Sequence, residues 1–180
     1  MKYDVIIIGG GPGGYVCAVS CAGYGLKTAL VEKRELGGTC LNRGCIPTKT
    51  LLFTAGLLEN LHKSSLFGIK DGKGEADFDG LRKRSAEVVS SLRSGVSKLL
   101  KQHKVDVYHG TGKVLSPSLV EVEGEEGKEQ LETGHIVLAT GGAPSVPPIP
   151  GSNLPGVYTS DSLLEKLPEG AVVRSPGMKY

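Results

Sequence analysis

An α/β fold, with helices on a parallel sheet and an inserted β-meander, is predicted by three features of this sequence. The first is a strand, a glycine-rich turn, a helix and a second strand within residues 3–32, which together form a βαβ unit. The second is a long amphipathic helical pattern beyond residue 77, and the third is a change to short strands beyond residue 105. This order of elements is typical of an α/β domain.

The βαβ unit begins with a β-branched run from Tyr3 to Ile8. A helix is expected from Gly13, and Gly25 is placed to close it. Thr28 to Val31 forms the second strand, so the connection is a right-handed crossover between parallel strands. The apolar positions expected on the helix are Val16, Ala18, Ala22 and Leu26.

Two more helices are predicted in the middle of the chain. One runs from Pro47 to His62 and is followed by a polar loop around residues 68–74. The other is long, with Asp77 or Asp79 as its N-terminal cap, and its apolar stripe predicts core packing. That stripe consists of Leu81, Val88, Leu92, Val96, Leu99 and Leu100.

Short strands follow the long helix and are interpreted as the inserted β-meander. They are predicted at Val105 to Tyr108, Leu119 to Val122 and Ile136 to Ala139. Residues 124–127, Gly-Glu-Glu-Gly, provide a turn, and Pro144 to Pro155 predicts a stiff exit from the last strand.

Composition narrows the classes of function. The formal net charge of 180 residues is only +2, so the sequence has no basic excess for nucleic acid or an anionic membrane, and a small-molecule partner is expected. No apolar run is long enough to span a bilayer, and we expect a soluble, cytoplasmic protein of one domain. The 27 glycines, roughly twice the usual share, are expected in turns that depend on backbone freedom.

The glycine-rich turn has the spacing of a dinucleotide site. Gly9, Gly11 and Gly14 directly follow a strand and open a helix. They allow a tight turn, close approach of a pyrophosphate, and close packing of helix on strand, while the helix N-terminus favours negative charge. Glu32 ends the second strand, where an acid accepts hydrogen bonds from an adenosine ribose. The motif alone leaves FAD and NAD both open.

Cys40 and Cys45 are predicted to form a redox-active pair. In an ideal helix their Cα atoms would lie roughly 8 to 9 Å apart, too far for a disulfide, so a bond requires a bend. Gly44 supplies backbone freedom, and Pro47 lets a helix restart. The alternatives are two small core residues or two metal ligands, although metal sites prefer closer spacing and no histidine lies nearby; no metal is expected.

The other cysteines and the histidines receive structural interpretations. Cys17 and Cys21, four apart on the first helix, are expected to pack inward as small apolar residues. The histidines have no motif around them and are expected at the surface; they are His62, His103, His109 and His135.

The segment from Gly37 to Lys49 resembles the active-site motif of the FAD-dependent pyridine nucleotide-disulfide oxidoreductases. In this segment, the residues Leu41, Asn42 and Ile46 are most similar to those of the family members that act on lipoyl groups. Residues 138–144 also resemble the family's second flavin-contacting stretch, with Gly142 in place of the usual serine. The resemblance covers residues 1–165 and implies a Rossmann-like FAD-binding domain there, present as its N-terminal, incomplete part.

Residue roles follow from the resemblance. It implies that Cys40 is the interchange thiol that meets a dithiol substrate, that Cys45 forms the charge-transfer thiolate beside the flavin, and that Lys49 stabilises the reduced flavin. The residues expected to contact the cofactor are Gly9, Gly11, Gly14, Glu32, Gly38, Thr39, Lys49, Gly112, Thr140, Gly141 and Gly142.

The implied function is electron transfer from a lipoyl dithiol through Cys40 and Cys45 to FAD and, in the complete family enzyme, to NAD, with a role in cell redox homeostasis. Residues 166–180 are interpreted as a tail where an NAD domain would begin, with Ala171 to Val173 starting its first strand. This sequence shows no counterpart of the family's NAD site, ribitol-binding segment or interface domain, through which the family's homodimer largely forms.

Three alternatives stay open at this point. The first is that the chain is a catalytically inactive, truncated FAD-binding fragment. The second is that it acts on the substrate of a glutathione or mercuric reductase, and the third is that it is a simple NAD-binding protein. The first rests on the elements without a counterpart, since the full NAD-linked reaction is not expected of this chain alone. The second shares the same disulfide chemistry, and the third rests on the glycine motif alone.

Overall fold

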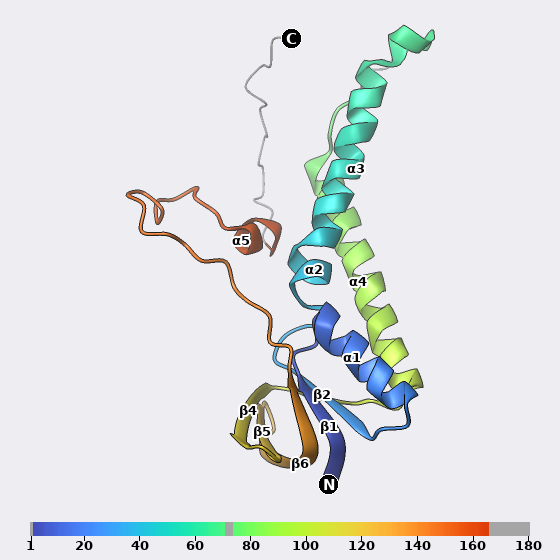
Figure 1. Cartoon of the computed structure of the whole chain (residues 1–180). Coiled ribbons are helices and arrows are strands. Elements are labelled where there is room, and N and C mark those ends of the chain that lie inside the picture. The colour runs from blue at the N-terminus through green and yellow to red at the C-terminus, as the bar shows by residue number, and fades with distance from the viewer. Residues whose placement is uncertain (1, 71–73, 166–180) are drawn as a thin grey trace.

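A computed structural model describes residues 2–70 and 74–165 of the chain (Figure 1). The expected strand at 171–173, the tail at 166–180 and part of the loop at 68–74 lie outside the described residues. The elements, in chain order, are β1 (Lys2–Ile8), α1 (Pro12–Gly23), β2 (Thr28–Glu32), α2 (Gly38–Arg43), α3 (Cys45–His62), the 3-10 turn η1 (Ser64–Phe67), α4 (Phe78–Gln102), β3 (Asp106–His109), β4 (Thr111–Ser116), β5 (Leu119–Gly124), β6 (Gly127–Leu138) and α5 (Ser160–Glu165).

One sheet of the order β3-β2-β1-β6-β5-β4 organises the domain. Strands β3, β2, β1 and β6 run parallel, whereas β6, β5 and β4 pair antiparallel as a meander. The twelve-residue strand β6 belongs to both parts, because its first half pairs with β5 and its second half with β1. The predicted α/β fold with an inserted β-meander is therefore confirmed.

The assignment of residues 105–108 to the meander is wrong. These residues contribute to β3, which pairs parallel with β2 from Ala29↔Asp106 to Glu32↔His109. The long helix α4 provides the crossover that a parallel neighbour requires. Residues 136–138, also assigned to the meander, pair parallel with β1, and the meander consists of β4, β5 and the first half of β6. Strand β4 was not predicted, because an exposed lysine and a glycine interrupt the apolar alternation that marks a strand in a sequence.

Both faces of the parallel strands are buried, which explains the unbroken apolar run of β1. Val5, Ile7 and Leu30 face α1 and α4, where they pack with Ala18 and Leu100. On the other face Tyr3, Ile6, Ile8, Ala29 and Val31 pack with Val120, Val122 and Leu131 of the meander.

The helices confirm most of the sequence predictions and correct two. Asp77 caps α4, since its carboxylate accepts hydrogen bonds from the backbone of Asp79 and Gly80. On the predicted stripe, however, Leu92 is exposed and the neighbouring Val89 is buried instead. On α1 Val16 is likewise exposed, because the sheet is contacted by the face that presents Gly14 and Ala18. A helix of 3.6 residues per turn buries only one such face.

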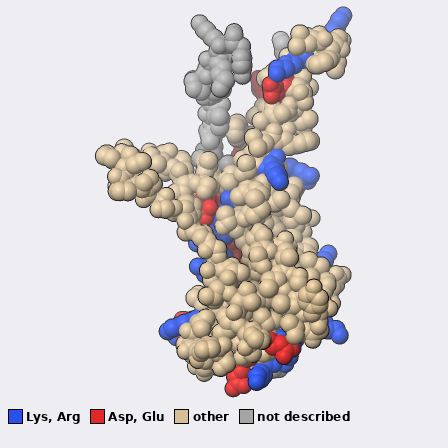
Figure 2. All heavy atoms as spheres, viewed as in Figure 1, with Lys and Arg blue, Asp and Glu red and all other residues tan. Residues whose placement is uncertain are grey.

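Helices α3 and α4 pack side by side and extend well beyond the sheet, and the irregular segment after β6 leads away to α5 (Figure 1). Among the described residues, no helix is long and apolar enough to cross a membrane. On the face in Figure 2, basic and acidic side chains lie scattered, without a continuous basic patch.

A polar cluster lies among the amino-terminal ends of the parallel strands. The buried Tyr3 hydroxyl donates to Asp106 Oδ2 at 2.9 Å and shares a 2.7 Å hydrogen bond with the Tyr108 hydroxyl. Burial, followed by the hydrogen bonds with Tyr108 and Asp106, raises the pKa of Tyr3 far above its ordinary value. Folding therefore keeps Tyr3 protonated at high pH.

Alkaline titration should show this linkage. Between about pH 9 and pH 11 the unfolded tyrosine ionises while folded Tyr3 stays protonated, so up to about 1.4 kcal/mol of unfolding free energy is lost. Tyr3→Phe removes this contribution and should flatten the decline, measured by urea unfolding at each pH. Parallel declines in the two proteins would contradict the assignment to Tyr3.

Candidate active site

The carboxyl ends of three neighbouring parallel strands meet at one edge of the sheet. Ile8 of β1 lies level with Val31 of β2 and Leu138 of β6. The backbone continues the same pattern beyond the strands, because Gly9 N–H donates to Val31 O and Ala139 N–H donates to Ile8 O, each at 2.8 Å. In open α/β sheets this edge is where ligands bind.

The glycine-rich turn lies on this edge and depends on missing side chains. Gly9 has φ +110°, and a Cβ on it would collide with Ala139 O. A Cβ on Gly14 would overlap Gly9 O, so the first turn of α1 packs directly on the end of β1. Helix α1 begins at Pro12 with Gly11 as its N-cap, without a side-chain cap or an acid in its first turn. Its N-terminal partial charge is therefore left for a ligand.

Glu32 lies beside that turn at the end of β2, as predicted. Its buried carboxylate accepts hydrogen bonds from Gly10 N–H at 2.5 Å and from Arg34 N–H at 2.8 Å. The side chain therefore holds the turn in place from the neighbouring strand.

The cysteine segment is fastened to the same turn. Gly37 N–H donates to Gly10 O at 2.8 Å, and Gly38 lies so close to Gly11 that a Cβ on Gly38 would be 2.6 Å from the Gly11 Cα. Gly37 and Gly38 have φ +97° and +58°, which let the chain turn back here. Two motifs separated in sequence thus form one site.

Cys40 on α2 and Cys45 on α3 form a disulfide, with their Cα atoms 4.7 Å apart. The bend predicted between them is present, since α2 ends at Arg43 and α3 begins at Cys45. A Cβ on Gly44 would lie 2.9 Å from Thr39 O and 3.2 Å from Cys40 Cα, so this approach requires glycine. Cys40 is half-buried and Cys45 is exposed.

The disulfide favours the bonded pair over the two alternatives, small core residues or metal ligands. In the described part of the chain, no group of three or more His, Cys, Asp or Glu is arranged to hold a metal ion.

The other predicted contact residues are distributed around the turn and the disulfide. Thr39 is exposed on α2, and Lys49 is exposed one helical turn beyond Cys45, on the same face of α3. Gly112 lies in β4, where a Cβ would press on Ile8 and Val31. Residues 140–142 are exposed just beyond β6.

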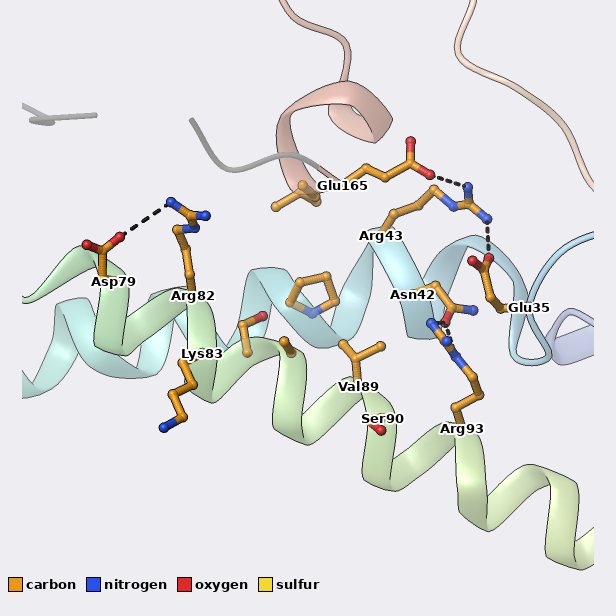
Figure 3. A pocket seen from close by; sticks show the side chains of 14 residues that line it. Glu35, Asn42, Arg43, Asp79, Arg82, Lys83, Val89, Ser90, Arg93 and Glu165 are labelled. Carbon is orange, nitrogen blue, oxygen red and sulfur yellow. Dashed lines mark hydrogen bonds and ion pairs between the residues drawn. The ribbon is translucent and has the colours of Figure 1, made fainter. Parts of the chain in front are cut away.

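Sequence reasoning missed the side chains that hold the cysteine segment. Asn42 donates from Nδ2 to Leu36 O at 3.0 Å and to Gly38 O at 2.9 Å, and its Oδ1 accepts two hydrogen bonds from Arg93 of α4, at 2.7 and 3.0 Å (Figure 3). Arg93 carried no signal in the sequence, because a polar residue on an amphipathic helix is expected to face solvent.

Arg43 ties the same segment to α5. Its buried guanidinium pairs with Glu165 at 3.1 Å and with Glu35 at 3.6 Å, and both glutamate side chains are exposed (Figure 3). Its Nε is buried without a hydrogen-bond partner. A cavity of about 980 Å³ lies here between α2, α4 and α5, and its lining includes Asn42, Arg43 and Arg93 but neither cysteine.

Removing the two carboxylates should destabilise the protein more than removing the arginine. A Glu35→Gln/Glu165→Gln variant leaves a buried charge without counterions, at an expected cost of about 1–3 kcal/mol. Arg43→Met removes that charge and fills similar space, so its expected cost is smaller. Urea unfolding measures both, with Glu87→Gln as an exposed ion-pair control. A larger loss in Arg43→Met than in the double variant would refute this account.

A parallel sheet, a glycine-rich turn at its carboxyl edge and a disulfide fastened to that turn define a nucleotide-binding redox domain. The chain belongs to the pyridine nucleotide-disulphide oxidoreductase family, whose model matches residues 3–170.

Known relatives narrow the resemblance. The chain is 49% identical over 152 residues to dihydrolipoyl dehydrogenase of Acholeplasma laidlawii, covering 83% of this chain and 44% of the relative. It is 40% identical over 190 residues to dihydrolipoyl dehydrogenase of Bacillus subtilis strain 168, covering 98% and 40%. It therefore spans less than half the length of these relatives.

A solved structure has the same fold. The HOCl-induced flavoprotein disulfide reductase RclA from Escherichia coli, determined as a Cu(II) complex, superposes with a TM-score of 0.73 at 34% identity, covering 93% of this chain and 36% of that one. The family and the fold imply a flavin cofactor.

Proposed function

We propose that this chain is the FAD-binding, dithiol-reactive part of a dihydrolipoyl dehydrogenase, which takes electrons from a lipoyl dithiol through Cys40 and Cys45. The single observation that supports this most strongly is the Cys40–Cys45 disulfide, held against the glycine-rich turn by Gly37 and Gly38. Dihydrolipoyl dehydrogenases of two bacteria, at 49% and 40% identity, are consistent with the substrate class.

The residues present fit FAD. The glycine turn forms a cradle that a Cβ at Gly9 or Gly14 would distort, and the first turn of α1 contains no acidic residue, so its N–H groups suit a pyrophosphate. Glu32 lies at the end of β2 for the adenosine ribose, although its carboxylate also supports the turn. When bound, the flavin supplies a two-electron acceptor for the thiols.

The cysteines perform thiol–disulfide exchange. A substrate thiolate attacks the Cys40 sulfur, the Cys40–Cys45 bond breaks, and Cys45 leaves as a thiolate. The second substrate thiol then attacks the substrate sulfur of the mixed disulfide and releases Cys40. The substrate dithiol becomes a disulfide and the two cysteines gain its two electrons. A flavin held at the glycine-rich turn would supply the acceptor for those electrons, so that Cys40 and Cys45 can bond again.

The position of Lys49 on α3 supports the reduced state of the proposed site. Lys49 lies one turn from Cys45 on the same face of α3, so its ammonium group would stabilise the negative charge of a reduced flavin held beside Cys45. In the complete relatives' reaction NAD is the proposed final acceptor. A redox-active disulfide alongside free Cys17 and Cys21 suits a cytoplasmic protein, where structural disulfides are rare.

The test is anaerobic mixing of the FAD-loaded chain with dihydrolipoamide, followed by visible absorption. We expect the flavin spectrum to change with the native chain and to stay unchanged with Cys40→Ser, whereas Cys21→Ser behaves like the native chain. Retained yellow colour without any response to dithiol in the native chain would indicate an inactive flavin-binding fragment and overturn the proposed reaction. A faster response to reduced glutathione than to dihydrolipoamide would overturn the proposed substrate.

A further inference from the structure

A second cysteine pair lies on α1, outside the proposed reaction. Cys17 and Cys21 are free thiols, both half-buried, with their sulfurs 4.0 Å apart. Both pack against the core, as the sequence predicts. Two thiols this close on one rigid helix form a preorganised dithiol.

The helix favours a bridge by a third atom over a direct disulfide. Residues four apart on a helix have Cβ atoms roughly 5–6 Å apart, whereas a disulfide requires about 3.5–4.5 Å, so direct bonding would distort α1. An atom bonded to both sulfurs removes the need to bring the two Cβ atoms to disulfide distance. With bonds of about 2.3 Å, as sulfur forms to zinc, one atom can reach two sulfurs that lie 4.0 Å apart.

The number of ligands selects the kind of centre. Structural zinc requires four ligands, and within residues 2–70 and 74–165 no cluster of three or more His, Cys, Asp or Glu is arranged to hold a metal. The pair therefore suits an atom that needs only two sulfur ligands from the protein. Trivalent arsenic that already carries one organic substituent is such a centre, because its third bond is to carbon.

We propose that Cys17 and Cys21 form a binding site for trivalent organoarsenicals, separate from Cys40 and Cys45. In the reaction with an arsenic(III) oxide R–As=O, two As–S bonds form and the arsenic–oxygen bond breaks. The two thiol protons leave with the oxygen as one water molecule, and no atom is oxidised or reduced. The product is a ring closed through the two side chains and one helical turn.

The state of the thiols agrees with this chemistry. Burial, followed by the hydrogen bond with Cys21, raises the pKa of Cys17, so Cys17 stays protonated near neutral pH. Because the thiolate is the attacking species in disulfide exchange, Cys17 is a poor nucleophile toward the Cys40–Cys45 disulfide.

Phenylarsine oxide tests the site in a Cys40→Ser/Cys45→Ser chain, without flavin or dithiol substrate. We expect one equivalent to bind, both remaining thiols to be lost to thiol titration, and an intact mass increased by one phenylarsine oxide less one water. Native chain with the Cys40–Cys45 disulfide intact should bind the same single equivalent, which covers the case that the double variant does not fold.

The matched control keeps two thiols and changes only their spacing. Val16→Cys/Cys17→Ser, in the same background, places them five apart, starting from an exposed position, and should bind at least about 100-fold more weakly because the second bond loses its intramolecular advantage. Equal binding by this control, or no binding by native chain, would overturn the proposal. Neither outcome depends on flavin reduction, so failure here is distinguishable from failure of the proposed reaction.

Discussion

A Gly14→Ala chain is expected to lose about 3 kcal/mol or more of its free energy of unfolding, and with it the retention of FAD. The added methyl group would overlap Gly9 O, which is a backbone atom of a residue whose N–H donates to Val31 O. Neither α1 nor β1 can yield, because Ala18 and Ile7 are completely buried between them. The glycine-rich turn must therefore open, which separates the proposed pyrophosphate site from β1.

Gly13→Ala is the matched control for that change. It lies one residue earlier on the same helix, and its Cβ would meet nothing within 4 Å. It should be neutral or stabilising by up to about 1 kcal/mol, since alanine suits a helix better than glycine. Urea unfolding and the flavin-to-protein ratio after gel filtration measure both effects. Similar losses in the two variants would show that α1 tolerates no alanine in this turn for reasons other than the contact with Gly9.

The second large effect is expected at Gly44, between the two cysteines. Gly44→Ala places a methyl group 2.9 Å from Thr39 O and 3.2 Å from Cys40 Cα, in the approach that closes the disulfide. The open dithiol form can relax this contact, so the bonded form should lose about 1–3 kcal/mol relative to it. The reduction potential of the pair should rise by about 20–60 mV, and the disulfide becomes easier to reduce.

Equilibration with glutathione buffers, followed by thiol trapping, measures that potential. Gly56→Ala is the control, because it lies on the same helix α3 and its Cβ would meet nothing within 4 Å. Its potential should equal that of the native chain, while the helix gains slight stability. An unchanged potential in Gly44→Ala would mean that the dithiol form keeps the same close contact.

The local chemistry of this chain was predictable from its sequence. Glycine spacing after an apolar strand requires a tight turn, and cysteines five apart require a bend, because an ideal helix holds them too far apart. Both expectations concern neighbours in the chain, where bond geometry limits the choices. For the same reason, the sequence predicted the strands β1 and β2, the helix between them and the Asp77 cap.

What failed in the prediction depended on long-range pairing. Residues 106–109 look like any short alternating strand, and only the partner decides whether they join β2 or the meander. The stripe on α4 could not distinguish Val89 from Leu92, since the buried face depends on how α4 rotates against α1 and the sheet.

The sequence alone determined the type of site: a glycine turn with the spacing of a dinucleotide site, and a cysteine pair that can bond only where the backbone bends. Only the tertiary structure decided that they form one site, because the hydrogen bond from Gly37 to Gly10 and the contact of Gly38 with Gly11 join residues from separate elements. It also decided how the pair is held, through Asn42 with Arg93 and through Arg43 with Glu165. These contacts arise between side chains up to 122 residues apart, where local conformational preference carries no information.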